Sequence, residues 1–317
     1  MSIPKAGSAK TSMPKKFLFS LLLVIVLISA GIFVYRYITS DENSQQSNPE
    51  TIRIASFNLQ ILGDTKLGRT TTVQTLAAII NQFDLVALQE VGSSNSTTSS
   101  ENSRRILDHF LLELNAQAGQ NSYSYLYGNQ YAILYRNKIL TPNFSQVHPD
   151  SENFAYPPLL AGFRVLSGNF DFVLATIHTR PANAVEELAS LAGLVETLAA
   201  AFNEPDIIML GDFNADGSYY NEGSSEALAG FHQTITVIPN SADTSVAPGD
   251  NSYDRIQLSP AMQSDWTGRW GIFRFEEHFD ASHILQLEGA ETTAGTIAAL
   301  SDHYPVWTVL YTNRDQD

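Results

Sequence analysis

An acidic and an amide side chain stand two residues apart at the end of a short apolar run. The run, Ile207 to Leu210, is typical of a buried β-strand, and Asp212 and Asn214 follow it. In an extended chain this spacing places both side chains on one face. A carboxylate and an amide at the edge of a sheet suit a hard cation and a phosphate. Taken alone, Gly-Asp-Phe-Asn is equally consistent with an Asx-turn that ends a strand.

Polar side chains border other predicted strands in the same way. If the strand ends lie on one side of a sheet, these groups converge on a single pocket. Taken singly, each has an ordinary explanation, for example Glu90 as a surface charge, His178 as an edge histidine and Asp302 as a helix cap. Buried strands rarely end in so many polar groups by chance, so the set favours a functional site. Its members are Asn58, Glu90, His178, Asp212, Asn214, Asp302 and His303.

The segments that must position these residues alternate between strand and helix patterns. Apolar runs predict β-strands at 52–57, 84–89, 123–127, 131–136, 162–166, 170–177, 207–210, 253–258 and 304–311. Helical spacing predicts helices at 70–82, 104–118 and 183–201, the last with an Asn183-x-x-Glu186 capping box. Residues 93–103, rich in Ser, Thr and Asn, predict an exposed loop. No internal repeat is visible, so we expect one strand-rich α/β domain over residues 51–313.

Composition and charge restrict the classes of function. The chain of 317 residues is 44% hydrophobic and 10% aromatic, as in a globular protein. It has no cysteine, which excludes disulfides and thiolate metal sites. Residues 1–40 hold five basic residues and no acidic one, which leaves 13 basic against 33 acidic residues, or −20, for the remainder. Such a domain cannot hold a phosphate backbone by bulk charge, so a polyanionic substrate would need local basic groups or a metal.

The N-terminal region is typical of a membrane anchor. Residues 17–38 are largely apolar and, as a helix, would span roughly 33 Å, enough for a hydrocarbon core of about 30 Å. Lys15 and Lys16 precede the run, whereas only Arg36 lies near its other end. The positive-inside rule therefore predicts a basic cytoplasmic tail at 1–16 and a main domain outside the cytoplasm.

A cleaved signal peptide is the alternative for the same stretch. The apolar run continues past Ser29-Ala30, and Ile28 does not fit the small-x-small cleavage pattern, so an uncleaved anchor is favoured. The protein would be secreted if the helix were cleaved. Residues 39–50 are polar and predict a flexible linker to the domain.

Longer strings resemble a known superfamily. The strings are Phe57-Asn-Leu-Gln-Ile-Leu-Gly-Asp-Thr-Lys66, Leu88-Gln-Glu-Val91, 207–219, Tyr253-Asp-Arg-Ile256 and Ser301-Asp-His-Tyr-Pro-Val306. They are similar to the endonuclease/exonuclease/phosphatase superfamily, and Ile238-Pro-Asn-Ser-Ala-Asp-Thr244 with 178–187 resembles its deoxyribonuclease I subfamily. The resemblance covers almost all of 51–313. It implies a four-layer α-β-β-α sandwich of two mixed sheets with helices outside, and metal-dependent hydrolysis of a phosphodiester by water.

The metal ligands can be assigned on the same resemblance. Hydrolysis of a phosphodiester places further negative charge on the phosphoryl and leaving oxygens. Glu90, assisted by Asn58, would hold Mg²⁺ or Mn²⁺, which neutralises that charge. Asp212 and Asp302 would complete the ligand set or align the attacking water, and Asn214 would hydrogen-bond a phosphoryl oxygen. Hard oxygen ligands without cysteine fit Mg²⁺, Mn²⁺ or Ca²⁺ better than a soft metal.

Proton transfer needs a base for the water and an acid for the leaving oxygen. His178 and His303 are the natural pair, because histidine titrates near neutral pH. Asp254 is expected to accept a hydrogen bond from His303 and to fix its tautomer. An ionised Asp254 would also favour the protonated form of His303.

Several positions depart from the subfamily pattern. Two arginines that contact DNA in the subfamily correspond here to Gly92 and Tyr156, and an acidic partner of the first catalytic histidine corresponds to Asn129. The cysteines of one subfamily disulfide correspond to Gly217 and Asn251. The loss of two phosphate or groove contacts would weaken duplex binding and flatten its salt dependence.

Other side chains could compensate for the lost arginines. Arg104, Arg105 or Arg180 could do so from nearby loops, and Arg180 is the strongest candidate because it follows His178 by two residues. Tyr127 matches a base-stacking position, although a core or rim tyrosine explains it equally well. A structural Ca²⁺ could bind around Asp243 to Asn251, but Ala247, Pro248 and Gly249 within that loop offer no side-chain oxygen.

Three hypotheses follow from the sequence. The first is a membrane-anchored, extracytoplasmic endonuclease that cleaves DNA with little sequence preference. The second is a phosphodiesterase or phosphatase of the same superfamily that acts on a small or lipid phosphoester, since the groove arginines are missing. The third is a catalytically silent binding module, but no predicted metal ligand or catalytic histidine is lost. No protein partner is predicted.

Overall fold

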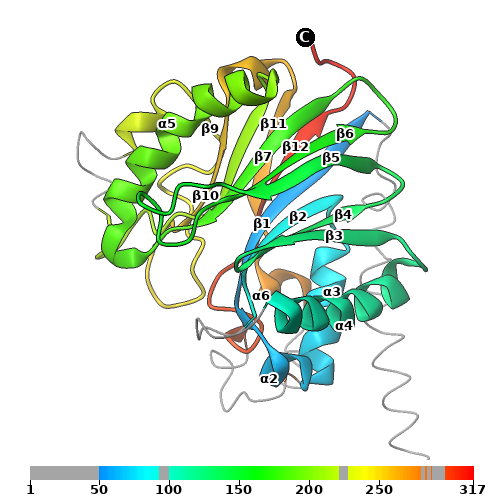
Figure 1. The fold of residues 1–317 in the computed structure, drawn as a ribbon. Helices are drawn as coiled ribbons and strands as arrows, with labels where there is room; N and C mark the ends of the chain where they lie inside the picture. The colour runs from blue at the N-terminus through cyan, green and yellow to red at the C-terminus, as the bar shows by residue number, and fades with distance from the viewer. Residues whose placement is uncertain (1–49, 93–99, 221–227, 280–282, 284–286, 288–296) are drawn as a thin grey trace, which may run out of the picture. The chain divides into compact units, whose positions relative to one another are not determined.

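The computed structural model describes residues 50–92, 100–220, 228–279, 283, 287 and 297–317 (Figure 1). The predicted tail at 1–16, the anchor at 17–38 and all but the last residue of the linker at 39–50 lie outside the described residues. Among the residues that are described, no helix is long and apolar enough to cross a membrane.

Two six-stranded sheets form the framework of the domain. The first has the order β11-β12-β1-β2-β4-β3, and the second has the order β5-β6-β7-β8-β10-β9. In the first sheet β1 and β2 are parallel, and in the second β7 and β8 are parallel, while the other pairs are antiparallel. The first sheet comprises β1 (Thr51–Leu62), β2 (Leu85–Val91), β3 (Tyr123–Gly128), β4 (Tyr131–Arg136), β11 (Trp266–Ile272) and β12 (Val306–Tyr311). The second comprises β5 (Leu140–Val147), β6 (Leu159–Val165), β7 (Asp171–His178), β8 (Ile207–Asp212), β9 (Ile235–Thr236) and β10 (Asp254–Leu258).

The sheets share one apolar core because alternate side chains of their strands point toward each other. Ile52 and Ile54 of β1 belong to the same buried cluster as Ile208 and Leu210 of β8. The helices α3 (Thr70–Ile80) and α4 (Ser100–Ala118) lie outside the first sheet, and α5 (Ala184–Phe202) lies outside the second (Figure 1). Short helices α2 (Asp64–Leu67) and α6 (Phe275–His278) and 3₁₀ turns at Pro181–Asn183, Ala229–Phe231 and Pro260–Gln263 complete the described elements. The prediction of two mixed sheets with helices is therefore confirmed.

Several element boundaries differ from the sequence prediction. Strand β1 continues four residues beyond Asn58, with a bulge in which Gln60 and Ile61 have positive φ. Helix α4 begins at Ser100, inside the predicted loop. Asn183 makes no side-chain cap, so the predicted capping box is wrong. Strands β5 and β11 were not predicted, because neither carries the continuous apolar run of a central strand.

Strands β7 and β8 approach closely at Gly211. This glycine has φ of 149°, and a Cβ there would lie 1.8 Å from the carbonyl oxygen of Ile177. Only glycine fits such a backbone conformation at such a distance. In the same pairing Ile177 lies opposite Gly211 and His178 opposite Asp212.

Candidate active site

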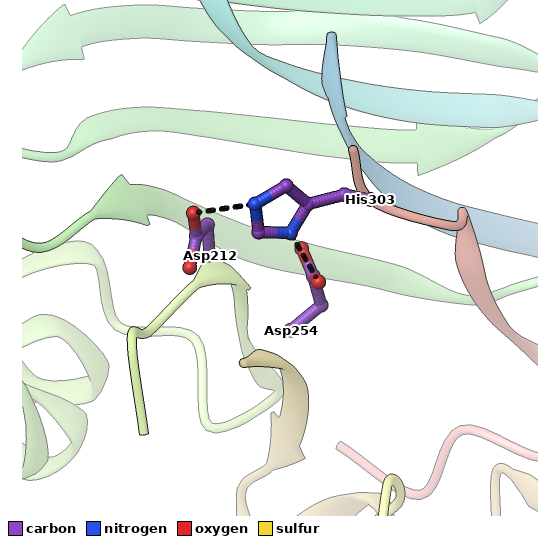
Figure 2. A group of neighbouring side chains, drawn as sticks. All are labelled: Asp212, Asp254 and His303. Atoms are coloured by element: carbon purple, nitrogen blue, oxygen red, sulfur yellow. Dashed lines mark hydrogen bonds and ion pairs between the residues drawn. The ribbon is translucent and has the colours of Figure 1, made fainter. Parts of the chain in front are cut away.

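The ends of the central strands bring the predicted polar residues together. Parallel pairing of β7 with β8 sets His178 beside Asp212, and antiparallel pairing of β10 with β8 sets Asp254 beside the same residue. His303, just before β12, reaches this group from the first sheet. Figure 2 shows the imidazole of His303 between the carboxylates of Asp212 and Asp254. Three strands and one loop thus supply one cluster.

Asp212 is the centre of this cluster. Its Oδ2 accepts a hydrogen bond from Asn58 Nδ2 at 2.9 Å and lies 3.5 Å from Nε2 of both His178 and His303. Its Oδ1 accepts from the backbone N–H of Asn214 at 3.0 Å. Burial alone would raise the pKa of Asp212, but His303, His178 and these donors outweigh it and lower the pKa. Asp212 is therefore ionised.

His303 is held by a second buried carboxylate. Its Nδ1 lies 2.7 Å from Asp254 Oδ2, and Asp254 has no exposed surface. Burial lowers the pKa of His303, but attraction to Asp254 and Asp212, with the hydrogen bond to Asp254, raises it well above its usual value. The imidazole is consequently protonated at neutral pH, with Nδ1–H directed at Asp254 and Nε2–H toward Asp212.

His178 has a different support from the one expected. Its Nδ1 lies 3.9 Å from Glu90 Oε1, and among the described residues this nitrogen is buried without a hydrogen bond. Asn129, the position that corresponds to an acidic partner in the subfamily, instead donates its Nδ2–H to the carbonyl of Pro157. The backbone N–H of His178 donates to the hydroxyl of Tyr131 at 3.1 Å, which fixes this end of β7.

The residues expected to hold a metal lie on the side of Glu90. Asn58 Nδ2 donates to Glu90 Oε1 at 3.2 Å as well as to Asp212. Glu90 has a positive φ of 58°, a strained backbone conformation that is found mainly at functional sites. Its side chain is 25% exposed, so one carboxylate among polar neighbours faces solvent. The accessible carboxylate of Glu90 fits a hard divalent cation, whereas Asn58 presents its amide nitrogen to Glu90 and its Oδ1 accepts from the backbone N–H of Gln60 at 2.9 Å.

Two further sets of possible metal ligands are Asp302 and a closely spaced group of three side chains. Asp302 Oδ1 lies 3.9 Å from His303 Nε2, and the side chain is 48% exposed. In the described part of the chain, Asp212, Asp254 and His303 offer ligand atoms within 4.8 Å of one another, and this set differs from the predicted Glu90, Asn58 and Asp302. Because Nδ1 of His303 is bonded to Asp254, the group is arranged as a carboxylate–histidine–carboxylate chain. The individual ligand roles stay predictions.

The predicted substrate contacts occupy other surroundings. Asn214, with φ of 45°, donates Nδ2–H to the carbonyl of Thr179 at 2.8 Å, and its amide has a second N–H for a phosphoryl oxygen. Arg180 is exposed, and its backbone N–H donates to Glu187. Tyr127, on the edge strand β3, lies under the guanidinium of Arg104 at 5.2 Å. Their substrate roles stay predictions.

Two buried groups that support the site had no predicted role. Lys66 Nζ donates to the carbonyls of Leu59, Gln60 and Leu300, and so joins the β1 bulge to the segment before Ser301. Burial lowers the pKa of Lys66 to about 8. The hydroxyl of Ser301 donates to the carbonyl of Asn58 at 2.7 Å. Both residues stand in the strings that carry the resemblance, which was the available signal.

A third buried group, Glu187, supports the loop after His178. Its carboxylate accepts from the backbone N–H groups of Ala155 and Arg180, each at 3.2 Å. Burial raises the pKa of Glu187 despite these donors. The carboxylate therefore joins the chain beyond β7 to the segment before β6.

The loop expected to bind calcium is tied by its own contacts. Asp243 Oδ1 accepts from the backbone N–H groups of Ser245 and Asn251, and its Oδ2 pairs with Arg274 at 3.2 Å. An arginine on this carboxylate competes with a cation, so calcium here stays a prediction. A Cβ at Gly217 would lie 3.3 Å from Asn251 Oδ1, so the two positions that replace the cysteines remain neighbours.

Comparison with known proteins identifies the class. The profile of the Endonuclease/Exonuclease/phosphatase family matches residues 55–303, and the chain belongs to this family. It is 28% identical to Deoxyribonuclease-1 of Gallus gallus over 272 residues, covering 81% of this chain and 91% of the relative. It is 31% identical to Deoxyribonuclease-1-like 1 of Cricetulus griseus over 274 residues, covering 81% and 83%. These matches confirm the predicted resemblance.

A solved structure supports the fold on its own. The crystal structure of an endonuclease/exonuclease/phosphatase family protein from Bacteroides thetaiotaomicron has a TM-score of 0.51 at 16% identity, covering 83% of this chain and 98% of that one. Family and relatives together identify the chain as a hydrolase that acts on phosphodiester bonds.

Proposed function

We propose that the chain is a divalent-metal-dependent endonuclease that cleaves DNA with little sequence preference outside the cytoplasm. The observation that carries the proposal is the placement of two histidines on one carboxylate oxygen, since His178 Nε2 and His303 Nε2 each lie 3.5 Å from Asp212 Oδ2. The two nitrogens are thus no more than about 7 Å apart, and a phosphodiester can lie between them with water on one side and its leaving oxygen on the other.

The reaction divides between the two histidines. Water attacks phosphorus and gives its proton to Nε2 of His178, and Nε2 of protonated His303 gives a proton to the leaving oxygen as the P–O bond breaks. Asp254 holds His303 in the required tautomer through the 2.7 Å bond to Nδ1. Asp212 keeps both rings oriented, and Asn214 donates to a phosphoryl oxygen.

A divalent cation, Mg²⁺ or Mn²⁺, would be held by Glu90 with Asn58 and Asp302, and it would supply charge neutralisation for the phosphoryl group. Glu90 fits this role because its carboxylate is accessible and its other neighbours, Asn58 and His178, are polar. The strained backbone at Glu90 is consistent with a position selected for chemistry rather than for packing.

DNA is favoured as the substrate by the deoxyribonuclease relatives, which match this chain over most of their own length. The domain is acidic, so binding must rely on local groups rather than on bulk charge. Exposed Arg180, two residues beyond His178, is the candidate for a phosphate contact. Arg104, which lies over the ring of Tyr127, is a second candidate from β3 and α4.

The substrate proposal is tested with plasmid DNA. The full chain, purified in detergent with Mg²⁺, is expected to nick supercoiled plasmid, and His303→Ala is expected to abolish nicking. His109→Ala is the matched control, because His109 is exposed on α4, outside the first sheet. No nicking by the unmodified chain, or equal nicking by His303→Ala, would reject the nuclease.

The alternative is a phosphodiesterase or phosphatase for a small or lipid phosphoester. It is favoured by Gly92 and Tyr156 where the subfamily has DNA-contacting arginines, and Tyr156 is 45% exposed. Turnover of bis-p-nitrophenyl phosphate or of a phospholipid without plasmid nicking would establish this alternative. Turnover of both, with DNA at the higher kcat/KM, supports the endonuclease.

The apolar stretch at residues 17–38, predicted to be a membrane anchor, supports an extracytoplasmic location for the domain. In cells that express the full chain, protease added outside is expected to digest the domain while the membrane stays intact. A full-length product in the membrane indicates an uncleaved anchor, whereas a shorter product in the medium indicates a cleaved signal peptide. Protection of the domain until lysis would contradict the location.

A further inference from the structure

A second group of carboxylates lies at the end of β8 opposite to Asp212. This acidic cluster consists of Glu204 after α5, Asp206 before β8, Asp265 before β11, and Asp315 and Asp317 after β12. Ligand oxygens of Glu204, Asp206 and Asp317 lie within 4.8 Å of one another. Two oxygens on one calcium ion, each at about 2.4 Å, can be at most about 4.8 Å apart. The three carboxylates therefore have the spacing of ligands around one ion.

Two members of the cluster each have one buried carboxylate oxygen without a hydrogen bond, unlike the acids of an ordinary exposed group. Asp206 and Asp265 are each 1% exposed. In the described part of the chain, Oδ2 of Asp206 and Oδ1 of Asp265 are buried and make no hydrogen bond. A buried carboxylate oxygen without a donor costs free energy unless a cation or a proton meets it. The unpartnered oxygens thus indicate a missing positive group.

Charge around Asp206 points the same way. Four further carboxylates act on it, those of Asp265, Asp315, Glu204 and Asp317. The positive charge of Arg314 attracts Asp265, but the guanidinium of Arg314 lies over the ring of Tyr311, 3.5 Å from its centre. The described groups around Asp206 are therefore mainly acidic.

The remaining contacts hold the carboxylates in place and leave an entry route. Glu204 Oε1 accepts from the backbone N–H of Asp206 at 2.9 Å. Asp315 accepts from the backbone N–H groups of Asp317 and Asp171 at 3.2 and 3.4 Å. Asp317 is exposed and Glu204 is partly buried, so an ion can enter from solvent past them to the buried Asp206.

We propose that the acidic cluster is a calcium site, with Glu204, Asp206 and Asp317 as ligands and Asp265 and Asp315 completing its charge. Calcium fits better than Mg²⁺, because Mg²⁺ demands short distances of about 2.1 Å in strict octahedral geometry, whereas calcium accepts irregular sets of oxygens. The site joins strands of both sheets at the end remote from the candidate active site. Its ion stabilises the packing of the two sheets and takes no part in hydrolysis.

The test follows calcium binding by thermal unfolding of the full chain in detergent. Calcium is expected to raise the Tm of the unmodified chain and of Glu90→Gln, which removes a proposed ligand at the candidate active site. The double variant Asp206→Asn/Asp265→Asn is expected to lose this response. Equal calcium responses in the unmodified chain and the double variant would overturn the proposal, whether or not Glu90→Gln keeps its response. A lower concentration of Mg²⁺ than of Ca²⁺ for the same rise would overturn the calcium assignment.

A second variant keeps the test decisive if the double variant does not fold. Asp317→Asn alters an exposed side chain and is expected to weaken calcium binding about tenfold without loss of folding. Terbium provides the direct readout, since Trp266 follows Asp265 in the chain and can sensitise its luminescence. Luminescence that is kept in Glu90→Gln and reduced in Asp317→Asn supports the site. Unchanged terbium and calcium affinities in Asp317→Asn overturn it.

Discussion

The two ends of strand β8 carry the same chemical group in opposite surroundings. Asp206 precedes the strand and Asp212 ends it, so about 20 Å of extended chain separates two buried carboxylates. Burial would raise the pKa of both. At Asp212 two histidines and two hydrogen-bond donors outweigh burial and lower the pKa, whereas at Asp206 four acidic neighbours add to burial and raise it to about 8. The neighbours, rather than burial, decide which carboxylate is charged.

The largest expected effect comes from removing the histidines that distinguish the Asp212 end. His303→Ala is expected to lower kcat about 10²–10⁴-fold, the usual contribution of a general acid, and His178→Ala to lower it similarly. Plasmid nicking with excess Mg²⁺ measures both, with His109→Ala as the control. Retention of more than a tenth of the activity in both variants would contradict the assigned proton transfers.

A smaller loss is expected when His303 keeps its ring but loses its support. Asp254→Asn removes the attraction that raises the pKa of His303, while burial continues to lower it. The reaction needs protonated His303, so the alkaline limb of the kcat/KM profile should move to lower pH, with roughly a 10–100-fold loss at neutral pH. A profile of unchanged shape would show that Asp254 acts only through packing.

On the Asp212 side of the comparison, the buried cation Lys66 joins the β1 bulge to the segment before Ser301. Lys66→Met leaves three buried carbonyls without their donor, and the free energy of unfolding is expected to fall by about 3 kcal/mol. Urea unfolding followed by circular dichroism measures the change. Lys138→Met, a substitution of the same kind at an exposed position, is the control. Equal stability of the two variants would contradict the structural role.

The pH dependence of stability sharpens the comparison at the Asp206 end. The folded chain keeps a proton on Asp206 up to about pH 8, whereas the unfolded chain releases it near its usual pKa of 3.8. Folding therefore binds protons between these values, and without divalent cations the Tm should fall by roughly 3–6 °C from pH 5.5 to 8. Asp206→Asn should flatten this fall. A Tm that rises over the same range in the unmodified chain, and is unchanged in the variant, would contradict the raised pKa.

The smallest expected effect concerns substrate binding. Arg180→Ala should raise KM for duplex DNA a few-fold, leave kcat nearly unchanged and reduce the salt slope by about one. Arg269→Ala, exposed on β11, is the matched control. Identical KM values for the two variants would remove Arg180 from the binding surface.

The sequence was sufficient for the central framework because buried parallel strands leave continuous apolar runs. Strands such as β2 and β8 were therefore visible, together with Glu90 and Asp212 beside them. The edge strands β5 and β11 were not visible, since β5 contains Pro142 and alternates with exposed residues, and β11 contains Gly268 and Gly271. Each of these strands pairs on one side only, and its pairing register depends on a neighbouring strand rather than on its own residue pattern.

The sequence predicted which residues form the site better than it predicted the contacts between them. Residues at strand ends could be expected to meet, but which nitrogen faces which oxygen depends on the pairing of β8 with β7 and β10. The buried positions of Lys66 and of the acidic cluster depend on contacts between segments more than 50 residues apart, such as Lys66 with Leu300. Charge counts in the sequence cannot distinguish a buried carboxylate from a solvated one.

The close contact between β7 and β8 at Gly211 limits which substitutions the protein can accept during evolution. A methyl group there would collide with the carbonyl of Ile177, immediately before the histidine that ends β7. Any replacement would push apart the two strands that carry His178 and Asp212, so the proton acceptor and the central carboxylate would be lost in a single step. Mutations in the loops around the site can change substrate preference, whereas position 211 between these strands must stay glycine.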